Sequence, residues 1–297
     1  IGYLLCGDGV AFCMDGGICC SDHFRVISDK LKKIIQLKRN LETVRPLGSE
    51  EKALEFANKM GSVQLTYNFG TEEKPIIFSI CEWVLNQPWK WGRQAGNLWR
   101  TTGDIQPKWA SVLAIYEFTV RLQKYSAKGG WNDPDMLEVG NGDLTFEENR
   151  SHFSLWCMMN APLILGNDIR KFINPDGTVD ENNKVLEILK NKDLIAIDQD
   201  KRGIQAKRIF SDVVSDILAK PLENHELAVC LFNKSNKPKE MQISLSKLHS
   251  DPFVDLPIKA SYEATNLWEN ETFELKEGIQ VTVAPHGVAV YKIKAID

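Results

Sequence analysis

The chain has 297 residues, of which 43% are hydrophobic and 26% are charged, and its formal net charge is −4. This length suits one large domain or two ordinary ones, and the composition is that of a globular protein with a substantial core. No Lys/Arg block has the length of a nucleic-acid arm, and no apolar run approaches the roughly 18 residues of a membrane span, so neither nucleic acid nor membrane is expected as a partner.

Seven cysteines are present, so at least one cannot belong to an intramolecular disulfide. Four of them crowd the first twenty residues. No C-x-x-C pair or zinc spacing occurs, and we expect neither a metal nor a cofactor. Glycosylation triplets begin at Asn149, Asn233 and Asn270, but such triplets arise often by chance. No charged segment followed by an apolar core opens the chain, so no signal peptide is visible.

The first quarter of the chain is predicted to be mainly helical. Residues 1–22 are rich in Gly and Cys and could hold a strand. Residues 23–60 carry two helical patterns that are separated by Pro46 and Gly48. The alternating stretch 62–70 is a strand or an extended loop.

Residues 75–170 contain four short apolar runs that each end in polar residues. These runs read PIIFSICEW, NLWRTTGDI, GGWNDPDMLEVGNG and NAPLILGNDIR. The run at 76–80 predicts a buried parallel strand, and residues 163–165 predict another. Apolar strands that end in carboxylates, Arg, Trp and Asn are how a β/α-barrel presents its active site.

Sequence patterns typical of helices separate these runs. One helix is predicted to open at Pro107 and to stop at Gly129, and a second covers residues 145–159. Residues 181–192 predict a polar helix. Near residue 203 the pattern changes to short alternating runs broken by Asn, Pro, Gly and Asp, which predict a small antiparallel sandwich or barrel. We therefore expect domains at 1–203 and 204–297 that pack together, because no long linker separates them.

Residues 75–170 hold the side chains that are best suited to catalysis. The candidate acids are Glu82, Asp104, Asp133 and Asp135, and Arg100 precedes Asp104 by four residues. No Ser-His-Asp set, phosphate loop or dinucleotide fingerprint accompanies them. Several carboxylates among aromatic residues fit acid/base and nucleophilic work on sugars. The neighbouring tryptophans could form a ligand platform or simply fill the core.

A glycosidic bond is broken by two carboxyl groups, one of which protonates the leaving oxygen. The pKa of that acid must be raised by burial or by a nearby negative charge. Asp104 follows Gly103 and stands near Trp99 and Trp109, which would allow such an environment. Alternatively, Asp104 caps the helix that is predicted to begin near Pro107.

The four blocks, in this order, closely resemble the retaining α-galactosidases of glycoside hydrolase family 27. The resemblance covers residues 75–210 and continues into DILAKPLENHELAVCLFNKS, which resembles the start of that family's C-terminal sandwich. It implies a TIM-type (β/α)8 barrel, present here only as strands five to eight, followed by an antiparallel β-sandwich. It further implies retaining hydrolysis of terminal α-D-galactosyl residues of oligosaccharides or glycoconjugates, with a homodimer as one assembly to consider. Eukaryotic relatives would suggest a secreted, lysosomal or vacuolar location.

Roles follow by position from this resemblance. Asp104 matches the general acid/base, and Arg100 matches the residue that contacts the sugar and the acid. Glu82 matches a hydrogen-bond partner near the sugar 2-position, with Leu85 beside it. Both would fill the space that α-N-acetylgalactosaminidases leave for an acetamide, which favours galactose. The remaining matches are two pocket contacts and four supporting residues: Asp135 and Met136, then Trp83, Trp99, Asn132 and Asp133.

The family's nucleophile block, which resembles K-Y-D-x-C, is not found. The most similar segment is GYLLCGDG, in which Asp8 is the candidate nucleophile. Residues 1–74 do not align with the family and are too short for four β/α units. The resemblance implies a disulfide between Cys81 and the cysteine beside the nucleophile, a partner that stays open here. The chain could be a fragment or faulty gene product, a relative that binds sugar without cleaving it, or an enzyme with a shifted nucleophile; the first is favoured.

Overall fold

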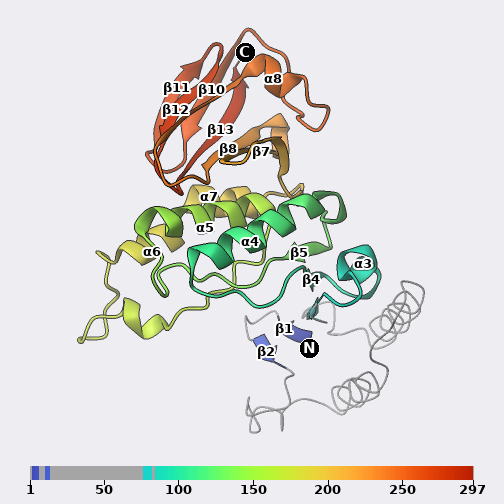
Figure 1. Cartoon of the computed structure of the whole chain (residues 1–297), viewed down its shortest axis with the longest axis vertical. Coiled ribbons are helices and arrows are strands. Elements are labelled where there is room, and N and C mark those ends of the chain that lie inside the picture. Colours follow the sequence, from blue (N-terminus) through green and yellow to red (C-terminus); the bar gives the residue numbers. More distant parts are fainter. Residues whose placement is uncertain (1, 7–10, 14–75, 82–83, 297) are drawn as a thin grey trace. The chain divides into compact units, whose positions relative to one another are not determined.

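The computed structural model describes residues 2–6, 11–13, 76–81 and 84–296 (Figure 1). The helices predicted over 23–60 and the stretch 62–70 lie outside these residues. The contacts divide the chain into two compact units, one formed by residues 1–103 and 129–133 and the other by residues 104–128 and 134–297. Each unit is described by itself.

The first unit holds a five-stranded sheet with the order β2-β1-β3-β4-β5. Its strands are β1 (Gly2–Cys6), β2 (Ala11–Cys13), β3 (Ile76–Ile80), β4 (Leu98–Arg100) and β5 (Trp131–Asp133). The strand predicted at 76–80 is confirmed. The pairs β3–β4 and β4–β5 are parallel, whereas β1 is antiparallel to both β2 and β3. A short 3-10 turn (Pro88–Lys90) and helix α3 (Gly92–Ala95) lie between β3 and β4.

A β/α-barrel is built from successive parallel strands, each followed by a helix, and β3, β4 and β5 have this parallel arrangement. The fourth apolar run adds a parallel bridge in the second unit, between Leu137 and Leu165. The described residues thus contain part of a parallel barrel, followed by the antiparallel sheets of the second unit. This confirms the predicted fold class.

Most α-helices of the second unit begin where a short polar side chain accepts from free backbone N–H groups. Thr145 caps α5 in a capping box with Glu148, and Asn160 ends the helix with a φ of 57°. The single helix predicted over 181–192 is wrong, because Asn183 and Asn191 each cap a separate short helix. The helices are α4 (Trp109–Thr119), the 3-10 turn Val120–Tyr125, α5 (Phe146–Met159), the 3-10 turn Ile169–Phe172, α6 (Lys184–Leu189), α7 (Lys192–Asp198) and α8 (Leu245–His249).

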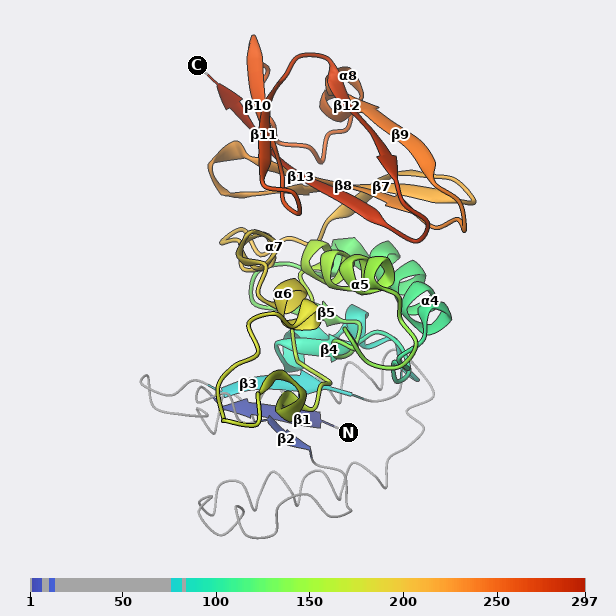
Figure 2. The same ribbon diagram turned by 90° about the vertical axis from the view of Figure 1, so that its left-hand side faces the viewer.

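The C-terminal strands form two antiparallel sheets that face each other as a sandwich (Figure 2). One sheet has the order β11-β10-β13-β8-β7-β6 and the other pairs β12 with β9. The strands are β6 (Lys207–Ser211), β7 (Ser215–Pro221), β8 (Leu227–Asn233), β9 (Lys239–Ser244), β10 (Ser261–Asn266), β11 (Glu271–Leu275), β12 (Gly278–Val283) and β13 (Val288–Ile296). A 3-10 turn (Glu223–His225) joins β7 to β8.

Strands β7 and β8 are buried on both faces. Ile217 and Val229 point into the core between the two sheets, whereas Leu218 and Cys230 pack into a second core with the helices. Figure 1 shows α4, α5 and α7 in a layer along this outer face of the sheet. These helices therefore pack against the sandwich within the second unit, and the domain boundary expected near residue 203 stays a prediction.

A buried polar cluster joins α4 to the sandwich. The carboxylate of Asp216, which is fully buried, accepts from the Tyr116 hydroxyl at 2.8 Å, from Arg208 at 3.1 Å and from Lys234 at 3.0 Å. Glu117 on α4 accepts from the same Arg208 and Lys234. Two carboxylates thus face two cations, which offsets the cost of burying them.

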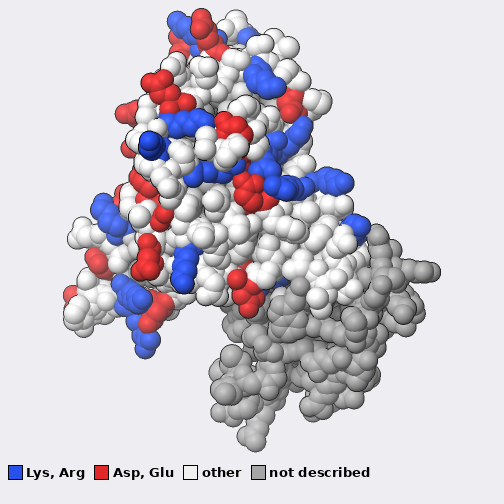
Figure 3. Space-filling view, viewed as in Figure 1, with Lys and Arg blue, Asp and Glu red and all other residues white. Residues whose placement is uncertain are grey.

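Figure 3 shows basic and acidic side chains mixed over the face of the second unit that it displays. Among the helices in the described residues, none combines the length and apolar character needed to cross a membrane.

Candidate functional site

Three of the predicted site residues cannot be placed: Asp8, Glu82 and Trp83 lie outside the described residues, and their roles stay predictions. The strand before Asp8 is described. It pairs antiparallel with β3, and its last residue, Cys6, lies opposite Ile76, the first residue of β3. A barrel strand that carries a nucleophile would run parallel to its neighbours, so β1 does not have the arrangement that the resemblance implies.

Trp99 fixes the ends of β4 and β5 in the first unit. Its ring is fully buried, and its Nε1 donates to Asn132 Oδ1 at 2.8 Å. A Cβ added at Gly92 or Gly130 would lie 2.7 or 2.8 Å from Trp99 ring atoms, so the glycines allow the ring to fit. The supporting role predicted for Trp99 and Asn132 stays a prediction.

Arg100 and Asp133 are register partners on neighbouring parallel strands. Residues in register on adjacent strands point to the same face of a sheet. Both are buried, with exposed fractions of 2% and 5%. Arg100 Nη2 donates to the carbonyl oxygen of Gly103 at 3.0 Å, so this guanidinium holds the backbone just before Asp104.

Asp104 is exposed at the start of the second unit. The burial that its tryptophan neighbours led us to expect is therefore absent from the described structure. The alternative role as a helix cap is also wrong, because α4 begins at Trp109, its N-cap is Lys108, and no side chain caps it.

Asp135 holds the backbone on the other side of Asp104. Its Oδ2 accepts from the backbone N–H of Ile105 at 2.8 Å, and the residue is only 8% exposed. Its φ is 82°, a left-handed conformation that is strained for most residues and tends to cluster at functional sites. Met136 beside it is half-buried.

Two side chains of α5, which sequence reasoning missed, position this segment. Trp156 Nε1 donates to the carbonyl oxygen of Asp135 at 2.8 Å, and His152 Nε2 accepts from the backbone N–H of Glu138 at 2.9 Å. Complete burial lowers the pKa of His152 to about 3, so its imidazole is neutral and can accept this bond. Their i, i+4 spacing on one face of a predicted helix was the signal available in the sequence.

Three of the described tryptophans serve packing. Trp91 and Trp99 are buried, and Trp109 stacks on His286 with ring centroids 4.9 Å apart. Core packing therefore explains these three better than a ligand platform. Leu85, the predicted specificity residue, is 61% exposed.

The described cysteines give no support to a disulfide. Cys157 and Cys230 are buried thiols, and burial raises the pKa of both. The cysteines nearest Asp8 in sequence have no described side chains, so the pairing expected for Cys81 stays a prediction. Within the part of the chain that is described, no group of three or more His, Cys, Asp or Glu could hold a metal ion.

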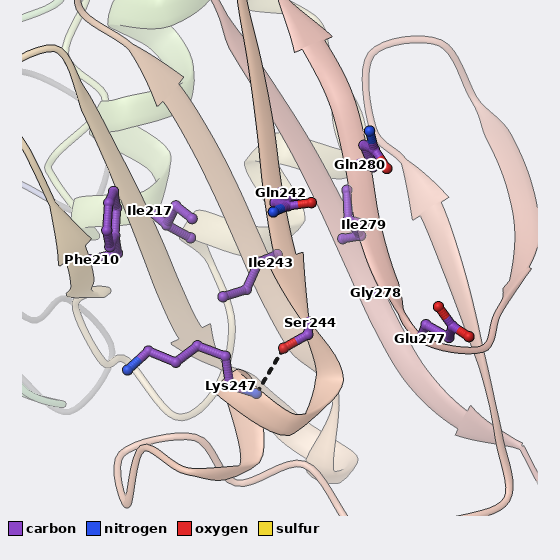
Figure 4. Close-up of a pocket in the computed structure, with 10 residues that line it drawn as sticks. All are labelled: Phe210, Ile217, Gln242, Ile243, Ser244, Lys247, Glu277, Gly278, Ile279 and Gln280. Atoms are coloured by element: carbon purple, nitrogen blue, oxygen red, sulfur yellow. Dashed lines mark hydrogen bonds between the residues drawn. The ribbon is translucent and has the colours of Figure 1, made fainter.

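A separate pocket of about 410 Å³ lies in the sandwich, lined by residues of β6, β7, β9, α8 and β12 (Figure 4). Phe210 and Ile217 lie on one side, and Gln242 and Gln280 on the other. At its base Ser244 Oγ accepts from the backbone N–H of Lys247 at 3.1 Å, which caps α8. None of the predicted site residues that are described is among those that line this pocket.

Two known protein families match parts of this sequence. The family described as Alpha galactosidase A matches residues 52–200, and the Alpha galactosidase C-terminal beta sandwich domain matches residues 214–293. The chain belongs to the alpha galactosidase A family. The first match includes strands β4 and β5 and the segment around Asp104. The second match covers most of the sandwich.

Relatives within the alpha galactosidase A family are similar along most of this chain. Alpha-galactosidase A of Cellvibrio japonicus is 39% identical over an alignment that covers 74% of this chain and 56% of that protein. Alpha-galactosidase of Cyamopsis tetragonoloba is 39% identical over 73% of this chain and 50% of its own length. The crystal structure of alpha-galactosidase I from Mortierella vinacea superposes with a TM-score of 0.72 at 27% identity, over 84% of this chain and 64% of that one. The chain thus spans about half the length of the relatives it matches.

Proposed function

We propose that this chain works in the hydrolysis of terminal α-D-galactosyl residues, with Asp104 as the general acid/base of a retaining two-carboxylate reaction. The observation that carries the proposal is the setting of Asp104 within a family of alpha-galactosidases. Its carboxylate is exposed, while the carbonyl before it accepts from Arg100 and the amide after it donates to Asp135. An exposed acid on a fixed backbone can meet the glycosidic oxygen in one orientation.

The reaction requires a proton donor and a second carboxylate. The acid protonates the leaving oxygen, a nucleophile attacks the anomeric carbon, and the acid then acts as base on the water that releases galactose. In this proposal Asp104 performs both proton transfers. Asp8 is the nucleophile candidate that the sequence offers, and Arg100 contacts the sugar.

Galactose is the proposed sugar because Glu82 and Leu85 are large residues at the positions beside the 2-substituent. They would fill the space that an acetamide needs. The discriminating measurement compares p-nitrophenyl α-galactoside with p-nitrophenyl α-N-acetylgalactosaminide. Faster turnover of the acetamido sugar would assign the chain to α-N-acetylgalactosaminidase activity instead.

A galactose-binding protein without turnover is the second candidate, favoured by the antiparallel pairing of β1 with β3. Such a strand does not present Asp8 in the way that a parallel barrel strand would. Hydrolysis of p-nitrophenyl α-galactoside by the folded protein supports the enzyme. Heat on mixing with galactose, without hydrolysis, supports the binding protein, and the absence of both contradicts each proposal. Assembly as a homodimer is a further proposal, which sedimentation can test.

A further inference from the structure

The three glycosylation triplets of the sequence differ sharply in their surroundings. A triplet Asn-x-Ser/Thr can accept an oligosaccharide only where the bulky, polar glycan can project into solvent. All three lie in the second unit, at Asn149, Asn233 and Asn270.

Asn149 belongs to the packing of α5. It is 5% exposed, and its Oδ1 accepts from the backbone N–H of Gly140 at 2.6 Å. Its Nδ2 donates to the carbonyl oxygens of Leu144 at 3.0 Å and Thr145 at 2.9 Å. A glycan on Nδ2 would replace one of these protons and would have no room in the folded chain.

The side chain of Asn233 is fully buried and makes more hydrogen bonds than that of Asn149. The residue lies at the end of β8, and its Nδ2 donates to the carbonyl oxygens of Lys237 at 2.8 Å and Ala284 at 2.9 Å. Its Oδ1 accepts from the backbone N–H and the hydroxyl of Ser235, the third residue of its own triplet. This amide joins two loops and cannot carry a sugar in the native fold.

Asn270 has the opposite setting. It closes the turn between β10 and β11, and all three residues of its triplet, Asn270 to Thr272, are exposed. Its backbone has a φ of 56°, a conformation that Asn tolerates well. None of the hydrogen bonds between described residues uses its side-chain amide.

The turn that presents Asn270 is fixed from below. Leu267 is buried, and its N–H donates to the carbonyl oxygen of Val290 at 2.9 Å. Trp268 Nε1 donates to Ser154 Oγ at 3.0 Å, and the Arg150 guanidinium lies 4.5 Å from the Trp268 ring centroid. Residues on the inner side of the turn make the protein contacts, so a glycan on Asn270 would disturb none of them.

We propose that Asn270 is an N-glycan acceptor and that Asn149 and Asn233 are not. In the modification, Nδ2 of Asn270 forms a bond to the anomeric carbon of an oligosaccharide carried by a polyprenyl diphosphate. The bond between that carbon and the diphosphate oxygen breaks, the diphosphate leaves with the electron pair, and the amide loses one proton to solvent. The proposal is independent of the proposed hydrolase function.

The test is expression of the full chain behind a secretion signal in a eukaryotic host, followed by peptide mapping of each triplet. We expect a glycan on Asn270 and bare Asn149 and Asn233 in protein that is folded by its circular dichroism. A bare Asn270, in secreted or cell-retained protein, would overturn the proposal. A glycan on Asn149 or Asn233 in the folded fraction would overturn it as well.

Two variants remove the glycosylation triplet by substitutions that should leave the fold intact. Asn270→Gly removes the acceptor and keeps the left-handed turn, since Gly adopts positive φ without strain. Thr272→Val removes the hydroxyl of the triplet and retains the β-branched shape. Each should shift the protein to the mass of one fewer glycan, and an unchanged glycan mass in either variant would contradict the assignment.

Discussion

At the scale of single residues, two charged side chains hold the backbone on either side of Asp104. Arg100 bonds the carbonyl oxygen of Gly103, and Asp135 bonds the N–H of Ile105. The sequence predicted all three charged residues as site residues, because polar residues at strand ends are a local pattern. It could not predict that Asp135 accepts from the N–H of Ile105, because a hydrogen bond between residues 30 apart in sequence depends on the fold.

Asp135 offers a matched pair of variants. Asp135→Asn keeps an oxygen that can accept from Ile105 and a side chain that tolerates positive φ, so we expect near-native folding. Asp135→Ala leaves the buried Ile105 N–H without its partner and should lower the free energy of unfolding by about 1–3 kcal/mol. Urea denaturation followed by circular dichroism measures both. Equal stability of the two variants would show that the bond to Ile105 contributes nothing.

The buried His152 predicts a dependence of stability on pH. Its pKa falls from an ordinary value of 6.5 to about 3 in the folded chain, so between these pH values the unfolded chain binds the proton more readily. Stability should therefore be complete above pH 6.5 and should decrease as pH falls toward 3, by at most about 1.4 kcal/mol per pH unit.

Urea denaturation between pH 7 and 5 checks this expectation, in a window where most carboxyl groups stay ionised. His152→Gln retains an acceptor for the Glu138 N–H but does not titrate. The variant should show a flatter dependence than the native chain. Parallel pH profiles would mean that His152 is not the titrating group.

At the scale of elements, local signals predicted β3 and α5 well. The apolar run at 76–80 and the helical pattern over 145–159 are local signals, and the observed bounds agree with them to within one residue. Prediction failed where competing local signals met, as at Asn191, which begins a new helix inside the predicted one. A strand was expected in the region of β7, but the burial of both its faces was not, because that burial follows from packing between distant segments.

The capping box of α5 can be tested directly. Thr145 Oγ1 accepts from the Glu148 N–H at 3.2 Å, and Glu148 Oε2 accepts from the Thr145 N–H at 2.8 Å. Thr145→Ala should reduce the free energy of unfolding by about 1 kcal/mol, whereas Thr145→Ser should be close to native. A thermal or urea melt distinguishes them, and an unaffected Ala variant would remove the cap from the account of this helix.

At the scale of the molecule, the helical layer and the sandwich share one hydrophobic core within the second unit. They should therefore unfold together, in a single transition that near-ultraviolet and far-ultraviolet circular dichroism report alike. Asp216→Ala, which leaves Arg208 and Lys234 short of a buried partner, should lower the free energy of unfolding by about 3–5 kcal/mol. Glu187→Gln, in an exposed pair with Lys184, is the control and should change it by less than about 1 kcal/mol. Separate transitions for helices and strands would contradict the shared core.

The measurement that tests the central claim most directly compares two leaving groups in the native chain and in Asp104→Asn. Melibiose has a poor leaving group that needs a proton from the acid, whereas p-nitrophenolate can leave without one. If Asp104 is the general acid, the variant should lose kcat/KM on melibiose by about 10²-fold or more beyond its loss on p-nitrophenyl α-galactoside. Equal losses on both substrates, or a folded native chain that cleaves neither, would contradict the account.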